Sequence, residues 1–233
     1  MFCIKIADMC IGIDNKYNGV FRLCRDYICE GEPEFSVCVG EEEIVEELKN
    51  YGGQATPDYA ESVCIYRSIC QKLPDFGAFL LHAAIVECDG VSYAFSAPSG
   101  TGKSTHAALW LSHFGSKARI INGDKPIICI KDDKIIACGT PWCGKEGKNE
   151  NTSSELASLC FIERGEKNEI RRIDAAEAVT RVFSQILMPK TEGKIDKLFS
   201  LLDRMLCRLP CYVLRCTVSD EAVSVAYNGM KGE

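Results

Sequence analysis

The sequence lacks the residue spacing that zinc sites use. It has three histidines and fifteen cysteines, yet no two cysteines form a C-x-x-C pair and no cysteine has a histidine beside it. Structural zinc sites are typically built from such pairs, so the spacing argues against a zinc framework. Many of the cysteines interrupt apolar runs such as IICI and CYVLRC, where a reduced thiol packs as a small hydrophobic group. We therefore expect reduced core thiols in a cytosolic protein.

Long apolar runs and an excess of positive charge are also missing. The longest apolar stretch, GAFLLHAAIV, is too short to span a bilayer, and the N-terminal MFCIKIADMC has no long apolar core after a basic start. We expect a cytoplasmic protein with no membrane partner. The net charge of -6 and the absence of a basic patch argue against a nucleic-acid partner.

What is present is an ordinary globular composition of 233 residues, 46% of them hydrophobic. Residues 1 to about 40 alternate short apolar runs with turn residues, a pattern typical of short antiparallel strands, one of them in GVFRLC. EEEIVEELKN predicts a short helix, and helical spacing continues over about 57–73. The pattern predicts a strand-rich N-terminal section over 1–77 and one α/β domain over 78–233, with no repeat or linker.

Within 78–233, strands and helices alternate. FLLHAAIVEC and VSYAFSA predict a hairpin that turns at Asp89-Gly90, and PIICIKDDKIIACG predicts a second hairpin that turns at Asp132 and Asp133. Apolar patterns predict a helix in KSTHAALWLSHF, strands in KARIIN, SLCFIER and YVLRC, two helices near 175–187 and 195–209, and a last helix from about residue 220.

The turn between VSYAFSA and the next helix matches a phosphate-binding loop. The full pattern is G-x-x-x-x-G-K-[ST], and this chain reads A-P-S-G-T-G-K-S, with Ala97 in place of the first glycine. The later glycines let the backbone N–H groups face phosphate oxygens, and the helix adds its positive N-terminal end. We expect Lys103 to reach the β- and γ-phosphates and Ser104 to complete a magnesium shell. The predicted nucleotide-binding residues are Ser99, Gly100, Thr101, Gly102, Lys103, Ser104 and Thr105.

Two more residues are candidates for the chemistry. Asp124 follows the strand ARIIN, at the strand end where α/β proteins bind ligands, and could hold magnesium or accept a proton from an attacking hydroxyl. A turn-forming aspartate before Pro126 is the alternative. His82 stands in an apolar run ahead of the loop, where a core histidine is the common interpretation. His106 and His113 are expected to be structural.

The stretch GTPWCGKEGKNEN, residues 139–151, is rich in glycine, lysine and polar side chains. Such a loop is suited to closing over an anionic ligand, and an ordinary exposed loop is the alternative. Lys145, Lys148 and Trp142 are its candidate ligand-contacting residues.

With SGTGKS, His82 and Asp124 together, the sequence resembles the C-terminal domain of HPr kinase/phosphorylase over roughly residues 78 to 165. It is similar to a branch of HPr-kinase-like proteins that carries SGTGKSTH, INGDKP and GTPWCGK. The loop of the related phosphoenolpyruvate carboxykinases reads S-G-T-G-K-T. The resemblance implies a carboxykinase-like P-loop domain with a mixed sheet, a catalytic role for His82 beside Asp124, and a homo-oligomer, since the kinase family is commonly hexameric. The family's second signature, of the E-x-R-G type, is not evident here.

These observations favour a kinase that uses ATP and Mg²⁺ to phosphorylate a hydroxyl-bearing acceptor, with catalytic residues Asp124, His82 and Lys103 and with Ser104 and Asp124 on the metal. The acceptor could be a small molecule, a peptide or a protein, and pyrophosphate could replace ATP. The alternative from a different class is a nucleotide-binding regulatory module that docks a partner and turns over little ATP. A carboxykinase is the third hypothesis.

Overall fold

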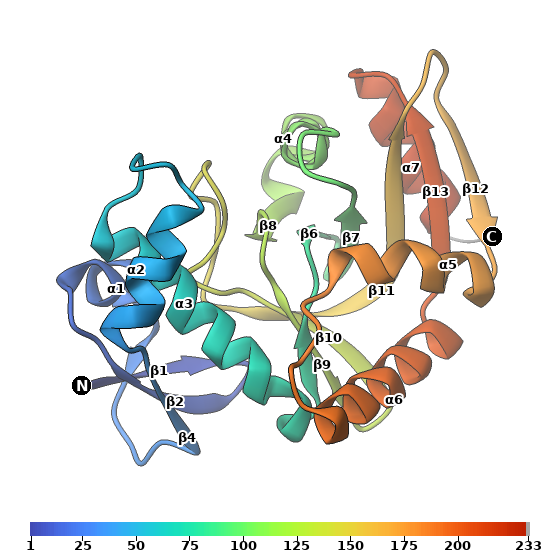
Figure 1. The fold of residues 1–233 in the computed structure, drawn as a ribbon. Coiled ribbons are helices and arrows are strands. Elements are labelled where there is room, and N and C mark those ends of the chain that lie inside the picture. Colours follow the sequence, from blue (N-terminus) through green and yellow to red (C-terminus); the bar gives the residue numbers. More distant parts are fainter. Residues whose placement is uncertain (232–233) are drawn as a thin grey trace.

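Two β-sheets and the helices packed on them form a mixed α/β structure, which confirms the predicted fold class. The computed structural model describes residues 1–231, and Figure 1 shows the N-terminal sheet at one end of the molecule and the larger sheet beside it. No helix within these residues is both long and apolar enough to cross a membrane.

The N-terminal sheet has the strand order β3-β1-β2-β4. Its inner face is set by strand alternation: Ile4 and Ile6 are buried, whereas Lys5 between them is exposed. The elements of this section are β1 (Phe2–Ile6), β2 (Met9–Asp14), α1 (Asn18–Leu23), η1 (Arg25–Tyr27), β3 (Ile28–Cys29), β4 (Phe35–Cys38), α2 (Glu41–Lys49), α3 (Pro57–Lys72) and η2 (Leu73–Phe76).

The segment GVFRLC, predicted as a strand, forms helix α1 instead. Val20 and Cys24 are four residues apart, so a helical turn places both on one face, and both are completely buried. Phe21 and Leu23 remain exposed. Helix α1 lies in the crossover connection between β2 and β4, and these two strands pair in parallel. The prediction of an antiparallel arrangement was wrong for that pair.

Helices α2 and α3 confirm the predictions for 41–50 and 57–73. Thr56 caps α3 by accepting a hydrogen bond from the Tyr59 backbone N–H at 3.3 Å, and Pro57 occupies the first helical position. Tyr66 and Ile69 lie on the buried face of the helix. They share a hydrophobic cluster with residues of the larger sheet, so the N-terminal section packs directly against that sheet.

The larger sheet has the order β5-β9-β10-β11-β7-β6-β8, and β13 extends it by pairing with β11 and β12. Strands β7, β11 and β13 run parallel, so their carboxyl ends lie at one edge. The elements are β5 (Ala78–Leu80), β6 (Ala83–Cys88), β7 (Val91–Ser96), α4 (Lys103–Phe114), η3 (Gly115–Lys117), β8 (Ala118–Asn122), β9 (Ile127–Lys131), β10 (Lys134–Cys138), β11 (Ser153–Arg164), β12 (Glu169–Ile173), α5 (Ala175–Val182), η4 (Phe183–Gln185), α6 (Glu192–Arg208), β13 (Cys211–Cys216) and α7 (Asp220–Met230).

Both predicted hairpins are present. β6 and β7 turn at Asp89-Gly90, and β9 and β10 turn at Asp132-Asp133, with all four residues at positive φ. The run FLLHAAIVEC, however, is broken: β5 pairs with β9, while β6 pairs with β7 and β8. His82 lies at this break. Strand β12 was not predicted, because EIRRI has no clear apolar alternation and is held by pairing with β13.

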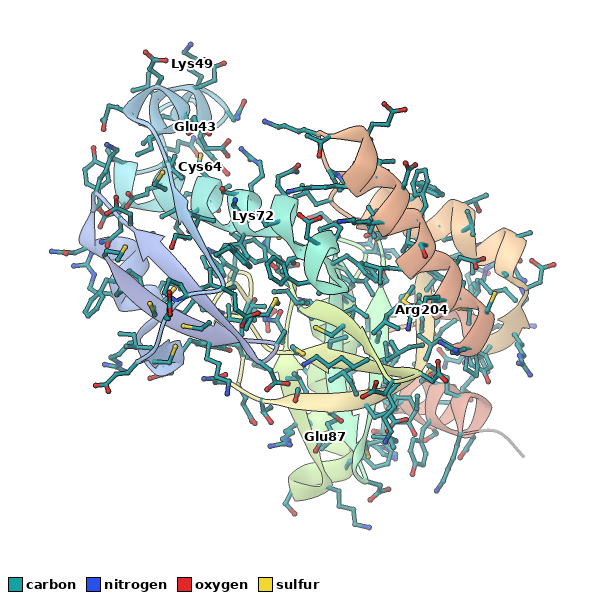
Figure 2. All side chains as sticks on the ribbon, turned by 90° about the horizontal axis from the view of Figure 1, so that it is seen from below. Glu43, Lys49, Cys64, Lys72, Glu87 and Arg204 are labelled. Carbon is teal, nitrogen blue, oxygen red and sulfur yellow. The ribbon has the colours of Figure 1, made fainter. Side chains whose placement is uncertain are left out.

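The start of helix α6 lies beside η2, which directly follows α3. Figure 2 shows this face of the molecule, where Lys72 marks α3 and Arg204 marks α6. Ion pairs from Lys194 and Lys197 to Asp75 join the two segments. The cysteines form no disulfide within the described range, and most of them are buried in the three hydrophobic clusters. This packing agrees with the expectation of core thiols.

His106 belongs to an aromatic cluster between α4 and the sheet. Its ring is 3% exposed, and its Nε2 accepts a hydrogen bond from the Trp110 indole N–H at 3.0 Å. Phe95 packs against both rings. His106 is therefore a structural residue, as expected, and its burial lowers its pKa to about 4.

This lowered pKa predicts a loss of stability in mild acid. Between pH 6.5 and 4 the unfolded chain binds a proton at residue 106 that the folded chain does not, so the free energy of unfolding falls as pH falls, by up to about 3 kcal/mol. Above pH 6.5 this histidine contributes no pH dependence. Urea unfolding at pH 7.5 and pH 5 measures the effect, with His106→Gln as a variant that keeps an acceptor for Trp110. An equal loss in both proteins would contradict the prediction.

Candidate active site

The predicted phosphate-binding loop follows β7 and leads directly into α4. Gly100 and Gly102 have φ values of 78° and 128°, a region that favours glycine, and open space surrounds both. Ala97 is not among the positive-φ residues and is buried at 2% exposure. The loop therefore needs glycine at positions 100 and 102 for its backbone conformation and does not need one at position 97.

The remaining loop residues are spread along the loop and the first turn of α4. Ser99 and Thr105 are exposed, whereas Thr101 and Ser104 are half-buried. No acidic side chain lies in the first turn of α4, so nothing negative competes for its N-terminal N–H groups. This end of the helix is suited to an anion.

Lys103 points back along the loop. Its Nζ donates to the Ala97 carbonyl at 2.9 Å and lies 2.9 Å from Nε2 of His82. Burial lowers the pKa of Lys103, an effect that nearby Asp124 opposes. The lysine is thus a largely buried cation held by a carbonyl oxygen and an imidazole nitrogen, and phosphate oxygens would be stronger acceptors for it.

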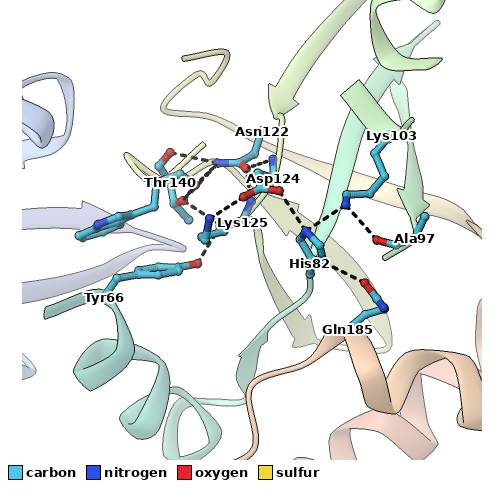
Figure 3. Close-up of polar contacts among 10 residues, drawn as sticks. Tyr66, His82, Ala97, Lys103, Asn122, Asp124, Lys125, Thr140 and Gln185 are labelled. Carbon is cyan, nitrogen blue, oxygen red and sulfur yellow. Dashed lines mark hydrogen bonds and ion pairs between the residues drawn. The ribbon is translucent and has the colours of Figure 1, made fainter. Parts of the chain in front are cut away.

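His82 and Asp124, 42 residues apart in sequence, are brought into contact (Figure 3). Nε2 of His82 lies 3.1 Å from Oδ1 of Asp124, while Nδ1 lies 2.9 Å from the Gln185 side-chain oxygen. Burial alone would raise the pKa of Asp124, but the hydrogen bonds from His82 and Lys125 hold it well below its ordinary value. Asp124 is therefore ionised throughout the physiological range.

One nitrogen of His82 cannot serve both neighbours at once. A protonated Lys103 can donate to Nε2 only when that nitrogen carries no hydrogen, and Nε2 can donate to Asp124 only when it does. Drawing Lys103 away from His82 would free Nε2 to carry a proton toward the carboxylate. The contacts of Lys103 and Asp124 with the imidazole are thus alternatives.

Asn122 shapes the turn that carries Asp124. Its side-chain oxygen accepts the backbone N–H groups of Asp124 at 2.9 Å and Lys125 at 2.7 Å, and its amide donates to the Thr140 carbonyl at 3.0 Å. Asn122 is completely buried. The INGDKP motif thus consists of a strand end, a turn-forming asparagine and the carboxylate that the turn presents.

The loop over 139–151 lies against this turn. Gly144, at φ 80°, is packed so closely that a Cβ there would lie 3.0 Å from Cβ of Asp124. Lys145 is exposed and Lys148 half-buried, and within residues 1–231 their one ion pair is a 3.8 Å contact between Lys148 and Glu146. Within the described range neither lysine is joined to the His82–Asp124 cluster.

Trp142, a predicted ligand-contacting residue, is buried in the protein instead of lying exposed on the loop. Its side chain is 6% exposed and stacks on Tyr66, with ring centroids 4.5 Å apart at 22°. Its indole N–H donates to the backbone and side-chain oxygens of Ser62 at 3.1 and 2.9 Å. The structure thus places Trp142 in the core that joins the loop to α3.

A cavity of about 700 Å³ opens beside the loop, within the usual range for small-ligand sites. The sequence did not predict the wall of this cavity that faces the loop, because the residues of β11, α5 and η4 that form it carry no motif. Arg164, at the end of β11, donates to the carbonyls of Gly100 at 2.6 Å and Thr101 at 3.3 Å. Arg181 pairs with Glu163 at 2.7 Å. The cavity is lined by residues 96–101, 161–164, Thr180, Arg181, Ser184 and Gln185.

A protein-only metal cage is not found: among residues 1–231, no group of three or more His, Cys, Asp or Glu side chains is arranged to hold an ion. Magnesium in phosphoryl-transfer sites is bound through one or two protein oxygens together with substrate phosphates and waters. The Ser104 hydroxyl and the Asp124 carboxylate are donors of this kind, so these residues fit a nucleotide-borne Mg²⁺.

Comparison with known proteins finds similarity among solved structures alone. No family model matches the chain, and neither does any curated protein. Among solved structures, the chain is similar to the HPr(Ser) kinase/phosphatase from Coxiella burnetii, at 8% sequence identity and a TM-score of 0.39, over 64% of this chain and 94% of that one. A likeness this distant does not define what the chain binds.

Proposed function

We propose that this chain is a kinase that binds ATP with Mg²⁺ and transfers the γ-phosphoryl group to a hydroxyl of a bound acceptor. The observation that carries the proposal is the chain of contacts from Lys103 through His82 to Asp124 at the edge of the phosphate-binding loop. A phosphate loop alone would need only Lys103 and Ser104. The added carboxylate is a group that phosphoryl transfer to a hydroxyl uses as base or metal ligand, and the imidazole contacts it.

On the donor side, the N–H groups of the loop and of the first turn of α4 would bind the phosphates. Lys103 would leave the Ala97 carbonyl and His82 for the phosphate oxygens, because charged acceptors hold an ammonium more strongly than neutral ones. Magnesium, when bound through Ser104 and Asp124, would neutralise developing charge on the phosphates.

On the acceptor side, Asp124 would take the hydroxyl proton or hold the metal. Its lowered pKa keeps it ionised, which both roles require, and His82 orients it through the 3.1 Å contact. Gln185 fixes the imidazole from the other side at 2.9 Å. A flexible carboxylate would reach the reactive geometry only part of the time, so this support would contribute to rate through orientation.

The cavity of about 700 Å³ provides the space for the acceptor. It adjoins the first half of the loop, Ala97 to Thr101, and Gln185 connects its wall to His82. Its lining combines the apolar Phe161 with the hydroxyls of Thr180 and Ser184. A small polar molecule or the end of a peptide would fit this space, and a folded partner would have to insert a segment.

The test is a screen with γ-labelled ATP and Mg²⁺ against hydroxyl-bearing metabolites and short serine- or threonine-containing peptides. We expect acceptor-dependent transfer of label, strongly reduced in Lys103→Met, and a parallel arm with pyrophosphate identifies the donor. Tight nucleotide binding with slow hydrolysis that no acceptor changes would favour the regulatory module instead. Failure to bind either donor would overturn the proposal altogether.

A further inference from the structure

The turn that carries Asp124 is held from the N-terminal section as well as from its own domain. The Lys125 carbonyl accepts a hydrogen bond from the Tyr66 hydroxyl at 2.8 Å, across 59 residues of sequence (Figure 3). Thr140 Oγ1 also lies 2.8 Å from this carbonyl, but it is 3.1 Å from the Trp142 carbonyl too and has one proton to donate. Tyr66 is therefore the donor dedicated to this turn.

Tyr66 itself is rigidly placed. Its side chain is 5% exposed on α3 and its ring stacks on Trp142. The Trp142 indole N–H is in turn bonded to Ser62, one helical turn earlier on α3. Burial raises the pKa of Tyr66 well above its ordinary value, so the hydroxyl remains a donor. Helix α3 thus holds the Asp124 turn through one side chain and the 139–151 loop through another.

The same loop touches both the carboxylate and the N-terminal section. Gly144 packs against Asp124. Five residues later, Asn149 donates to the Tyr27 hydroxyl at 3.0 Å, and Asn151 donates to the Asp26 carbonyl at 2.9 Å. The N-terminal section therefore reaches Asp124 by two routes, directly through Tyr66 and indirectly through the loop.

We propose that residues 1–77 position the carboxylate of Asp124 against His82, and that Tyr66 is the positioning residue through which they act. This inference rests on the proposed function for its effect on turnover, but its geometric part does not. Without the Tyr66 hydroxyl, the Lys125 carbonyl loses its dedicated donor and the turn gains freedom. The Asp124 side chain then spends less time in contact with the imidazole.

The test uses Tyr66→Phe in the full chain, a change that keeps the ring stacked on Trp142 and removes only the hydroxyl. The chain has three histidines, so the ring-nitrogen NMR signals of His82 can be assigned by their loss in His82→Gln. We expect Tyr66→Phe to shift the His82 signals. We also expect it to lower turnover about tenfold, the rate equivalent of one lost hydrogen bond, with the dissociation constant for Mg²⁺-free ADP unchanged.

Tyr93→Phe is the matched control, because Tyr93 is a buried tyrosine in the separate cluster around Trp110. It should leave the His82 signals and turnover unchanged. Unshifted His82 signals in Tyr66→Phe would overturn the inference, and so would a loss of Mg²⁺-free ADP binding together with turnover, which would indicate a general structural role. If the wild-type protein transfers no phosphate, the kinase proposal fails while the NMR comparison still decides the positioning role.

Discussion

Replacement of Asp124 by asparagine is expected to slow phosphoryl transfer by about 10²–10⁴-fold, the range that a positioned general base contributes. Asparagine preserves the size of the side chain and can still contact His82, so the geometry of the site should survive. It cannot accept a proton or place a negative charge beside a metal ion. The measurement is turnover at saturating MgATP with the acceptor that the screen identifies.

Two roles for Asp124 make different predictions about magnesium. If the carboxylate is the base, the loss persists at any Mg²⁺ concentration, because no metal replaces a proton acceptor. If the carboxylate holds the metal, higher Mg²⁺ recovers part of the activity by mass action. Asp132→Asn, at an exposed hairpin tip with positive φ, is the control and should have no effect. Full activity in Asp124→Asn would exclude both roles.

The parts of the site that could be predicted from sequence are those with local causes. The loop was predictable because Gly100 and Gly102 are needed for positive φ and the adjoining strand and helix follow from apolar spacing. Asp124 was predictable as a carboxylate at a strand end. The role of His82 was suggested only by the family resemblance, because an imidazole in an apolar run is typical of a core residue.

The parts that could not be predicted depend on contacts between distant segments. Gln185 binds His82 across 103 residues, and Tyr66 binds the Lys125 carbonyl across 59. Neither residue carries a motif, since an amide or a buried hydroxyl has meaning only once its partner is known. Arg164 ends an ordinary strand, and only the pairing of β11 with β7 brings it to the loop.

Trp142 shows how a composition argument can misplace a residue. A polar, glycine-rich stretch is typical of a mobile loop, and the sequence alone suggested that its tryptophan covers a ligand. Burial of this large side chain against Tyr66 gains more apolar contact than exposure would, and Ser62 satisfies its N–H. The stretch is therefore anchored at its start by Trp142, while Lys145 stays exposed further along.

Replacement of Lys103 by methionine is expected to lower turnover by about 10²–10³-fold, as removal of one charged donor to a transition-state oxyanion does. The affinity for MgADP should also weaken, because the loop loses its cation. The folded state should tolerate the change, since methionine keeps an unbranched apolar stem and removes a desolvated charge whose pKa burial already lowers. Isothermal titration with MgADP and the labelled-transfer assay measure the two effects.

His82 offers a readout of the same substitution that does not depend on activity. With Lys103 present, Nε2 of His82 has an ammonium at 2.9 Å and a carboxylate at 3.1 Å, and it can bond only one of them at a time. In Lys103→Met only the carboxylate remains, so Nε2 should carry a hydrogen more of the time, in addition to the Nδ1 hydrogen that bonds the Gln185 oxygen, and the ring-nitrogen NMR signals should report this change. Binding of MgATP to the wild type should shift those signals in the same direction, because phosphates would draw Lys103 away. Lys117→Met, an exposed lysine at the far end of α4, is the control. Signals that nucleotide leaves unmoved, with binding intact, would show that Lys103 stays on His82 and would contradict its transfer to the phosphates.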